Sequence, residues 1–261
     1  MSESYDVVIV GAGTAGLAAL REVRKRTDNF VLINDGAWGT TCARVGCMPS
    51  KALIEAANAF HRRTSFDEFG IEGAEGVGID IAAVLRRVRR LRDGFVSSTL
   101  KATSNLGERA ISGPARLLGV GKLEVNGRVF HARSIILATG SHPVVPGRWS
   151  ALGRKLLTTD TLFEQESLPP RMAVLGMGPV GVEMAQALSR LGIDITAFSE
   201  NKNIARLSDP EVNAAAIHLL GEEFSLQTGE KADLHMDSNQ LRVSTNTAKI
   251  ACDAVLVALG R

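Results

Sequence analysis

Two of the three cysteines in this 261-residue chain, Cys42 and Cys47, lie five residues apart in the stretch GTTCARVGCMPSK. Two thiols this close can exchange electrons with a disulfide or hold a soft metal ion. Residues five apart in a regular helix rise about 7.5 Å, which exceeds the roughly 4.4 to 6.8 Å between Cα atoms that a disulfide tolerates. The helix that holds this pair must therefore be distorted or begin between the two cysteines.

Pro49 gives a reason for such a break, because its ring crowds the preceding turn and it cannot donate a hydrogen bond to the carbonyl of Val45. A helix predicted over residues 52–59 leaves the cysteine pair near a helix N-terminus, where a thiolate is favoured. Zinc binding is the alternative, but the nearest histidine is His61 and the chain has no second cysteine pair. The pattern favours a redox dithiol, and we expect no metal site.

The elements that position the cysteines begin with a strand, a glycine-rich turn and a helix. In order they are residues 5–10, then Gly11, Gly13 and Gly16, then residues 17–23, and a second strand over residues 30–33. In such a unit the first glycine permits a tight turn, the second lets the backbone approach a pyrophosphate, and the third lets helix and strand pack closely. An acidic residue normally binds the ribose after the second strand. Here Asn34 stands in that place, followed by Asp35, and an amide can also hydrogen-bond a ribose.

The same order recurs in the second half of the chain. It comprises a strand over residues 171–175, then Gly176, Gly178 and Gly181, a helix over residues 182–188, and a strand over residues 193–198 followed by Ser199 and Glu200. Two complete fingerprints predict two dinucleotide-binding domains, which we assign to residues 1–150 and 151–261. The proline- and glycine-rich segment 143–147 marks the boundary between them.

The segment between the two fingerprints predicts short antiparallel strands joined by the turn Asn126-Gly127. A buried strand is expected next, over residues 132–141, with Thr139 and Gly140 in the turn at its end. The fold class expected is therefore α/β, with two Rossmann-like dinucleotide-binding domains. Cys252 stands on an apolar strand and is expected to be a core residue.

The chain is nearly balanced in charge, with 30 Lys and Arg against 28 Asp and Glu, so no nucleic-acid partner is indicated. An arginine-rich run over residues 85–92 fits a solvated helix face, because its apolar residues recur at helical spacing; a patch for an anionic ligand is the alternative. We find no signal-like start and no apolar segment near the roughly 20 residues of a membrane span. We expect a soluble, cytoplasmic protein, in a compartment where structural disulfides are rare.

Together these motifs resemble those of the flavoprotein disulfide reductases, the family that includes dihydrolipoamide dehydrogenase, glutathione reductase and mercuric reductase. The motifs are the two glycine fingerprints, the segment from Cys42 to Lys51, the strand end at residues 138–140, and the sequence DAVLVALGR over residues 253–261. The Cys-Met-Pro-Ser-Lys ending is more similar to dihydrolipoamide dehydrogenase or mercuric reductase than to glutathione reductase. The resemblance spans the whole chain but only the N-terminal part, a little over half, of a family member.

The resemblance implies a role for each residue of the cysteine motif. Cys42 would attack the substrate disulfide, and Cys47 would lie against a flavin. Lys51 would lie near that flavin and pair with Glu183. The residues implied in binding FAD are Gly11, Gly13, Gly16, Asn34, Asp35, Gly39, Thr40, Thr41, Lys51, Ala115, Thr139 and Gly140. Those implied in binding the nicotinamide nucleotide are Gly176, Gly178, Gly181 and Glu200.

The implied activity is a relay of electrons between a nicotinamide nucleotide, FAD and the Cys42/Cys47 pair, ending at a small disulfide or dithiol such as lipoamide. NAD is favoured over NADP, because a carboxylate after the second strand accepts from the ribose 2′-OH and repels a 2′-phosphate. NADP stays open, since Ser199 takes the usual acidic position, Glu200 follows one residue late, and Arg206 could hold a phosphate.

Family members continue with a second flavin segment and a dimerisation domain that supplies a histidine acid. We expect both to follow Arg261 in a homodimeric full-length protein; a naturally shortened chain is the alternative. None of the five histidines stands in the expected His-Pro-Thr-x-x-Glu context, so the present chain alone should turn over disulfides poorly. The alternative is a nucleotide-binding module with no turnover of its own.

Overall fold

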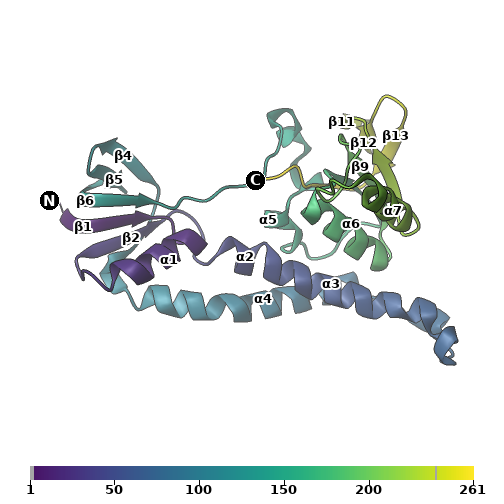
Figure 1. Ribbon diagram of the computed structural model, residues 1–261, viewed down its shortest axis with the longest axis horizontal. Helices are drawn as coiled ribbons and strands as arrows, with labels where there is room; N and C mark the ends of the chain where they lie inside the picture. The colour runs from purple at the N-terminus through teal and green to yellow at the C-terminus, as the bar shows by residue number, and fades with distance from the viewer. Residues whose placement is uncertain (1–2, 239) are drawn as a thin grey trace. The chain divides into compact units, whose positions relative to one another are not determined.

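The computed structural model describes residues 3–238 and 240–261, which form a mixed α/β structure with three β-sheets (Figure 1). Contacts divide the chain into two compact units. The first unit consists of Met1–Met48 with Leu91–Ser141, and the second of Pro49–Arg90 with His142–Arg261. Each unit contains its own glycine fingerprint and its own sheet, so each is described separately.

These units differ from the predicted domains, 1–150 and 151–261, in two places. The division after Ser141 precedes the predicted boundary by a few residues, next to the proline-rich segment. Residues 49–90 group with the second unit, since the long helices α3 (Cys47–His61) and α4 (Ile81–Ser104) each contribute to both units. The nucleotide assigned to each domain stays a prediction.

The first unit is built on a six-stranded sheet with the order β3-β2-β1-β6-β5-β4. Its strands are β1 (Glu3–Val10), β2 (Phe30–Asn34), β3 (Ala110–Ser112), β4 (Ala115–Gly119), β5 (Lys122–Val125) and β6 (Arg128–Leu137). The helical elements that lie wholly within this unit are α1 (Thr14–Val23), α2 (Thr41–Arg44) and the 3₁₀ turn η4 (Gly107–Arg109). β3, β2, β1 and β6 are parallel, and β6, β5 and β4 are antiparallel. A parallel half is thus continued by an antiparallel meander.

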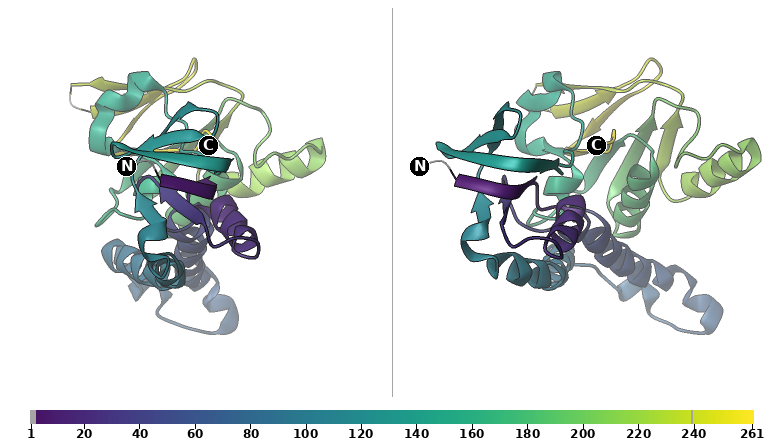
Figure 2. Two further views of the ribbon diagram at one scale, coloured as in Figure 1. Left: turned by 90° about the vertical axis from the view of Figure 1, so that its left-hand side faces the viewer. Right: turned by 60° about the vertical axis from the view of Figure 1, so that its left-hand side comes forward.

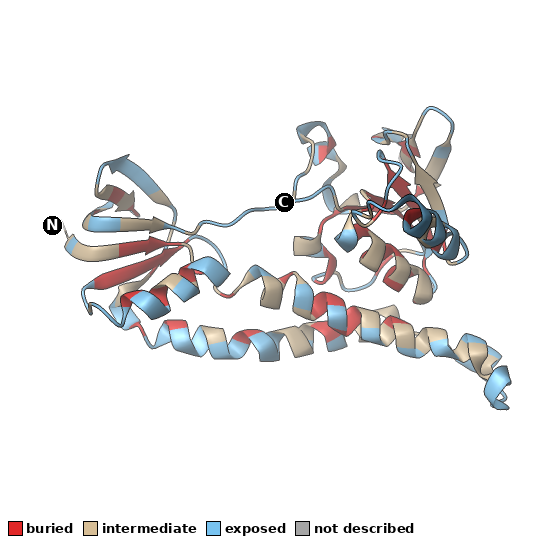
Figure 3. Cartoon of the chain, viewed as in Figure 1, coloured by how far each residue is buried: buried red, intermediate tan, exposed pale blue. Residues whose placement is uncertain are grey.

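Side chains on both faces of β2 and of the end of β1, residues 8–10, are buried, as their continuous apolar runs predict. On one face Leu20 of α1 belongs to a cluster with Ile9 and Leu32, so α1 covers this face (Figure 2). On the opposite face Val8 and Ile33 belong to a cluster that includes side chains of the meander. Figure 3 shows β2 as buried along its whole length, which places it in the centre of this core.

β6 differs from its prediction. The structure joins the predicted short strand and the predicted buried strand into one, and among its residues only Phe130 is buried. β5 pairs with β6 only from Arg128 to His131, whereas Ser134 to Leu137 pair with β1 alone among the described strands. Leu137 is accordingly 60% exposed. The prediction of a buried strand is therefore wrong, because nothing described covers the outer edge of this half of β6.

The second unit contains a five-stranded parallel sheet, β10-β9-β8-β14-β7, and a three-stranded antiparallel sheet, β11-β12-β13. The strands are β7 (Leu156–Leu157), β8 (Arg171–Leu175), β9 (Asp194–Ser199), β10 (Ser225–Thr228), β11 (Asp233–Asp237), β12 (Gln240–Ser244), β13 (Lys249–Cys252) and β14 (Ala254–Val257). The further helices are α5 (Thr159–Leu162), α6 (Pro179–Arg190) and α7 (Pro210–Gly221). The 3₁₀ turns are η1 (Arg62–Ser65), η2 (Asp67–Phe69), η3 (Ala74–Gly76) and η5 (Gly147–Lys155).

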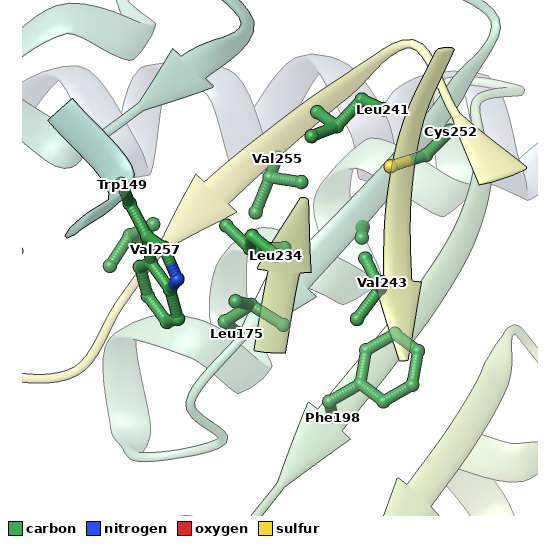
Figure 4. Close-up of a cluster of buried hydrophobic side chains, with 10 residues drawn as sticks. Trp149, Leu175, Phe198, Leu234, Leu241, Val243, Cys252, Val255 and Val257 are labelled. Carbon is green, nitrogen blue, oxygen red and sulfur yellow. The ribbon is translucent and has the colours of Figure 1, made fainter. Parts of the chain in front are cut away.

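The core of the second unit lies between its two sheets. Figure 4 shows the side chains that meet there: Trp149, Leu175, Phe198, Leu234, Leu241, Val243, Cys252, Val255 and Val257. Cys252 is 4% exposed, which confirms its predicted place in the core. Burial raises the pKa of its thiol to about 11, so this cysteine stays protonated and unreactive at neutral pH.

The predicted order of strand, turn, helix and strand is confirmed in both units, by β1, α1 and β2 and by β8, α6 and β9. The predicted hairpin turn is also present, with positive φ at Asn126 (52°) and Gly127 (77°), as a turn of type I′ requires. The α/β fold class is therefore confirmed. Within residues 3–238 and 240–261, none of the helices has both the length and the apolar character needed to cross a bilayer.

Candidate functional site

The first glycine turn, residues 11–16, connects β1 to α1 and leaves no room for side chains at two positions. Gly11 has φ +106°, and a Cβ added to it would lie 2.1 Å from the carbonyl oxygen of Ala138. A Cβ on Gly16 would lie 1.8 Å from the carbonyl oxygen of Gly11. A Cβ on Gly13 would meet nothing within 4 Å. Two glycines thus allow the strand and helix to touch, and the third faces open space.

The second glycine turn, residues 176–181, repeats this geometry between β8 and α6. Gly176 has φ +94° and a Cβ there would lie 2.6 Å from the carbonyl oxygen of Ala258, while a Cβ on Gly181 would lie 1.8 Å from the carbonyl oxygen of Gly176. The position at Gly178 is again open. The same three roles recur in the same order, so the two turns are structural copies.

Both turns lead into a helix whose N-terminus has no side-chain cap. The N-caps of α1 and α6, Gly13 and Gly178, have no side chain that could accept from the first amides of the helix, and neither helix has an acidic residue in its first turn. By contrast Asp209 caps α7 and accepts from the amides of Glu211 and Val212 at 2.9 and 3.0 Å. Open backbone amides, a favourable helix dipole and space beside a glycine fit the pyrophosphate of a dinucleotide.

Several residues predicted to bind FAD gather around the first glycine turn. The Asn34 side chain is buried and accepts from the Ala12 amide at 2.9 Å, while it donates to the carbonyls of Gly36 and Ala37 at 3.2 and 3.4 Å. Its amide therefore braces the turn, and contact with a ribose stays a prediction. Asp35 is exposed beside it.

Three further predicted residues lie near this turn along the chain. Thr139 and Gly140 follow Ala138, whose amide donates to the Val10 carbonyl at 2.7 Å and whose carbonyl lies against Gly11. Ala115 begins β4 and is only half-buried. Thr139 and Gly140 are thus beside the turn, whereas no described contact links Ala115 to it.

A pocket of about 780 Å³ surrounds the second glycine turn. Its walls include Gly176 and Gly178, the polar segment Glu200–Asn203, and Arg206. The volume suits a drug- or nucleotide-sized ligand. The amide of Ala205 donates to the carbonyl of Met177 at 2.7 Å, which fastens the loop that carries Arg206 to the glycine turn. Glu200 lines this pocket, and its contact with a nucleotide stays a prediction. Arg206, which the sequence marked as a possible phosphate ligand, lines it too, and so does Lys202, which the sequence did not single out.

The two cysteines stand at a break between two helices. Cys42 is in the short helix α2, and Cys47 is the first residue of α3. The sequence left open a distorted helix or one that begins between the cysteines, and the structure has the second arrangement. The helix predicted over residues 52–59 begins earlier, at Cys47. Pro49 lies in the first turn of α3, where its missing N–H costs no hydrogen bond, so it starts this helix instead of distorting it.

Gly46 lets the chain fold back on Cys42 within this break. A Cβ on Gly46 would lie 3.1 Å from the carbonyl oxygen of Thr41 and 3.3 Å from Cα of Cys42, closer than neighbouring atoms accept without moving. Upstream, Thr40 caps α2 by accepting from the Ala43 amide at 3.1 Å. The sequence shows that Gly46 lies between the two cysteines, but it does not show how close Gly46 comes to the backbone of Cys42.

The two thiols interact with each other. The pKa of the Cys42 thiol is raised, first by its side-chain hydrogen bond with Cys47, then by partial burial and by the charge that Cys47 would carry. The amides of Cys47 and Met48, at the start of α3, bond the Cys42 sulfur and act in the opposite direction. The two sulfurs are therefore close enough to act as one dithiol, with the Cys42 thiol held protonated to higher pH than an ordinary cysteine.

The other predicted FAD residues of this segment lie just before the dithiol. Gly39 has φ +110°, and a Cβ there would lie 3.0 Å from Cδ of Arg44 and 3.1 Å from Val96. Thr41 is exposed at the start of α2. Both belong to the turn that leads into α2, and their contact with a cofactor stays a prediction.

Lys51 and Glu183 form an ion pair within the second unit, as the resemblance implies. Nζ of Lys51 donates to Oε1 of Glu183 at 2.7 Å, with side chains 60% and 41% exposed. A pair this exposed contributes about 0–1 kcal/mol to stability. The pair matters because it fixes the Lys51 ammonium one helical turn after Cys47.

The comparisons with known proteins agree with these features. A family profile described as pyridine nucleotide-disulphide oxidoreductase matches residues 5–261. The chain belongs to this family. Dihydrolipoyl dehydrogenase of Thermus scotoductus is 31% identical over 274 residues, which cover 99% of this chain and 58% of that protein. Mercuric reductase of Staphylococcus aureus is 28% identical over 270 residues, which cover 98% of this chain and 48% of that protein.

Among solved structures, the HOCl-induced flavoprotein disulfide reductase RclA of Escherichia coli has a similar fold, with a TM-score of 0.82 at 22% identity. The match covers 98% of this chain and 57% of that one. The chain spans about half the length of the curated relatives it matches. The family and fold inferred from the motifs are thus confirmed. Among the described residues, no cluster of three or more His, Cys, Asp or Glu side chains could hold a metal ion.

The glycine geometry predicts different effects for two neighbouring substitutions. Gly181→Ala forces α6 away from the Gly176 carbonyl and should destabilise the protein by roughly 1–3 kcal/mol, the usual range for overpacking. A Cβ at position 178 meets no atom within 4 Å, so the melting temperature of the Gly178→Ala protein should stay close to that of the wild type. Its nucleotide binding should weaken, because the Cβ occupies space beside the turn. Thermal unfolding and fluorescence titration with NADH measure the two effects. Equal stability of the two variants would contradict the assigned packing role.

The raised pKa of Cys42 predicts its reactivity with iodoacetamide. A raised pKa keeps the thiol protonated to higher pH, so half-maximal alkylation of Cys42 should occur above the ordinary thiol value of 9.0. Cys47→Ala removes both the hydrogen bond and the charge, and should move that midpoint down. Mass spectrometry of peptides alkylated over a pH series measures this. A wild-type midpoint at or below 9.0, or one unchanged in Cys47→Ala, would refute the coupling.

Proposed function

We propose that this chain is the nucleotide-binding and dithiol-bearing part of an FAD-dependent dithiol/disulfide oxidoreductase most similar in activity to dihydrolipoamide dehydrogenase. The observation that carries the proposal is the hydrogen bond between Cys42 of α2 and Cys47 at the start of α3, in the same compact unit as an uncapped glycine turn. A structural cysteine pair would need neither the glycine turn nor the close approach at Gly46.

The dithiol residues would act in two steps. The Cys42 thiolate attacks one sulfur of a substrate disulfide, forming a mixed disulfide and releasing the other sulfur as a thiolate that takes up a proton. The Cys47 thiolate then attacks the Cys42 sulfur, so the Cys42–Cys47 disulfide forms and the second substrate thiolate leaves. The substrate is reduced by two electrons and the dithiol is oxidised by two. In the dehydrogenase direction the steps reverse.

Regeneration of the dithiol requires an electron donor, and the first glycine turn has the features to hold one. Bound FAD would supply two-electron transfer between a nicotinamide and the Cys42–Cys47 disulfide. The α1 amides and Gly13 would hold its pyrophosphate, and Cys47, the more exposed of the two cysteines, is the one left open to a flavin. Lys51 follows Cys47 by four residues in α3, and its ammonium would stabilise negative charge on the flavin.

For the second turn we propose NAD as the coenzyme. Glu200 lines the pocket and can accept from the ribose 2′-OH, as NAD-binding units commonly do. Lys202 and Arg206 also line the pocket and would favour a 2′-phosphate. The charges are therefore mixed, and the choice rests on whether the carboxylate or the cations face the ribose.

The proposed substrate is a small disulfide or dithiol such as lipoamide, handled by a homodimeric full-length protein in the cytoplasm. A mercuric or glutathione-type reductase remains the nearest alternative activity. A nucleotide-binding module without turnover is the second candidate. Assays of the full-length protein with lipoamide, glutathione disulfide and Hg²⁺ separate these candidates.

The proposed place of Cys47 predicts a spectroscopic signature. On two-electron reduction, FAD-loaded full-length protein should show a long-wavelength charge-transfer band, because a Cys47 thiolate donates to the flavin. Cys47→Ser should abolish the band. Cys42→Ser should show it without reductant, because Cys47 then has no disulfide partner. Anaerobic absorbance spectra test this, and a wild-type spectrum without the band would count against the assignment.

The proposed coenzyme predicts that NADH binds more tightly than NADPH, by about tenfold or more, the equivalent of 1.4 kcal/mol. Glu200→Gln should narrow that preference, because a neutral amide repels a 2′-phosphate less. Arg206→Gln is the matched control and should leave NADH affinity within about twofold. Competition titrations give the constants. Tighter binding of NADPH, lost in Arg206→Gln, would show that the pocket selects NADP.

A further inference from the structure

Helices α3 and α6 lie side by side within the second unit (Figure 1), and two side-chain contacts at matching spacing join them. At the first, Lys51 Nζ donates to Glu183 Oε1 at 2.7 Å. At the second, Arg190 Nη1 donates to Asn58 Oδ1 at 2.6 Å. From the first contact to the second, the α3 residue moves from 51 to 58 and the α6 residue from 183 to 190, seven positions each. The helices therefore run in the same direction, and the two contacts lie about 10.5 Å apart along each axis.

The second contact is much better anchored than the first. Arg190 Nε and Nη2 donate to the two carboxylate oxygens of Glu223 at 2.7 Å each, and the Gln186 amide donates to the same carboxylate at 2.7 Å. The Ser189 hydroxyl donates to the backbone carbonyl of Glu223 at 2.7 Å. The side chains of Arg190 and Glu223 are only 22% and 20% exposed. A forked, partly buried pair of this kind holds its geometry better than a single exposed one.

Arg190 bonded to both Glu223 and Asn58 is called the clamp below. The charge state of Glu223 keeps it in place. The pKa of the Glu223 carboxyl is lowered, chiefly by its hydrogen bond with Arg190, then by that with Gln186, and further by Arg190 and His61 charges. Glu223 is therefore ionised at neutral pH. The Lys51–Glu183 pair has no comparable support, because both side chains are about half in water, where salt screens the attraction and the lysine chain is free to move.

We propose that Arg190 is a positioning residue: held by Glu223, it fixes α3 on α6 through Asn58 and so keeps Lys51 in register with Glu183. The clamp therefore determines where the ammonium that follows Cys47 by one turn is placed. Its importance for disulfide turnover rests on the proposed function, whereas the positioning itself does not. The competing explanation is that Arg190 merely joins α6 to the segment after α7, with no effect on Lys51.

Zero-length cross-linking by a carbodiimide measures the register directly, because it joins an amine and a carboxylate only when they touch. The yield of the Lys51–Glu183 amide is read by mass spectrometry of the full chain after digestion. Asn58→Ala leaves the Arg190–Glu223 pair intact but removes its link to α3, and should lower the yield at least about threefold, since the exposed pair is weak alone. Asn58→Asp offers Arg190 a carboxylate and should restore the yield.

Arg171→Met is the matched control, because it breaks an arginine ion pair of the same unit, with Asp253 at 2.9 Å, away from α3 and α6. It should leave the yield unchanged. Circular dichroism shows that each variant is folded before its yield is compared. An Asn58→Ala yield equal to that of the wild type would overturn the proposal. Disulfide turnover by wild-type full-length protein tests the proposed function separately, so the two failures are distinguishable.

Discussion

A Cβ atom at Gly16 or Gly181 would lie 1.8 Å from the carbonyl oxygen of the first glycine in the same turn, and the rest of each unit depends on this contact. Because no side chain separates helix from strand, the start of α1 or α6 is held directly over the end of β1 or β8. The helix amides are left without a cap and point into open space beside Gly13 or Gly178. An anion-binding site therefore follows from the packing of two backbones.

The dithiol also lies at a helix N-terminus, that of α3. The amides of Cys47 and Met48, at the start of α3, donate to the sulfur of Cys42, where α1 and α6 would donate to a phosphate. Gly46 lets the backbone pass close to Cys42, as Gly16 and Gly181 let α1 and α6 pass close to their strands. The hydrogen bond with Cys47 raises the pKa of the Cys42 thiol. Further along α3, Lys51 and Asn58 face Glu183 and Arg190 of α6. One helix thus carries both a thiol at its first residue and a positioned ammonium one turn later.

The sequence revealed the fingerprints, their strands and the helix break because these depend on local geometry: glycines at fixed spacing, apolar runs, and a proline that can occupy only a first turn. It was misleading at β6, whose outer half pairs with β1 on one edge and with no described strand on the other. It did not show that the Asn34 side chain braces the glycine turn through the Ala12 amide. It gave no sign of the Arg190–Asn58 contact, because those residues are 132 positions apart and each resembles an ordinary polar residue on a helix surface. Local patterns encode the binding turns, whereas the clamp depends on tertiary packing.

The central claim is that the Cys42/Cys47 pair exchanges electrons with a flavin held at the first glycine turn. An anaerobic titration of the FAD-loaded full-length protein with dithionite tests it most directly, by counting the electrons taken up before the flavin is fully bleached. If the pair is a redox partner of the flavin, the oxidised protein takes up twice as many electrons per flavin as free FAD, because the disulfide and the flavin each accept a pair. Cys42→Ser should reduce the uptake to that of free FAD. An identical uptake by the wild-type protein and by Cys42→Ser would contradict the account.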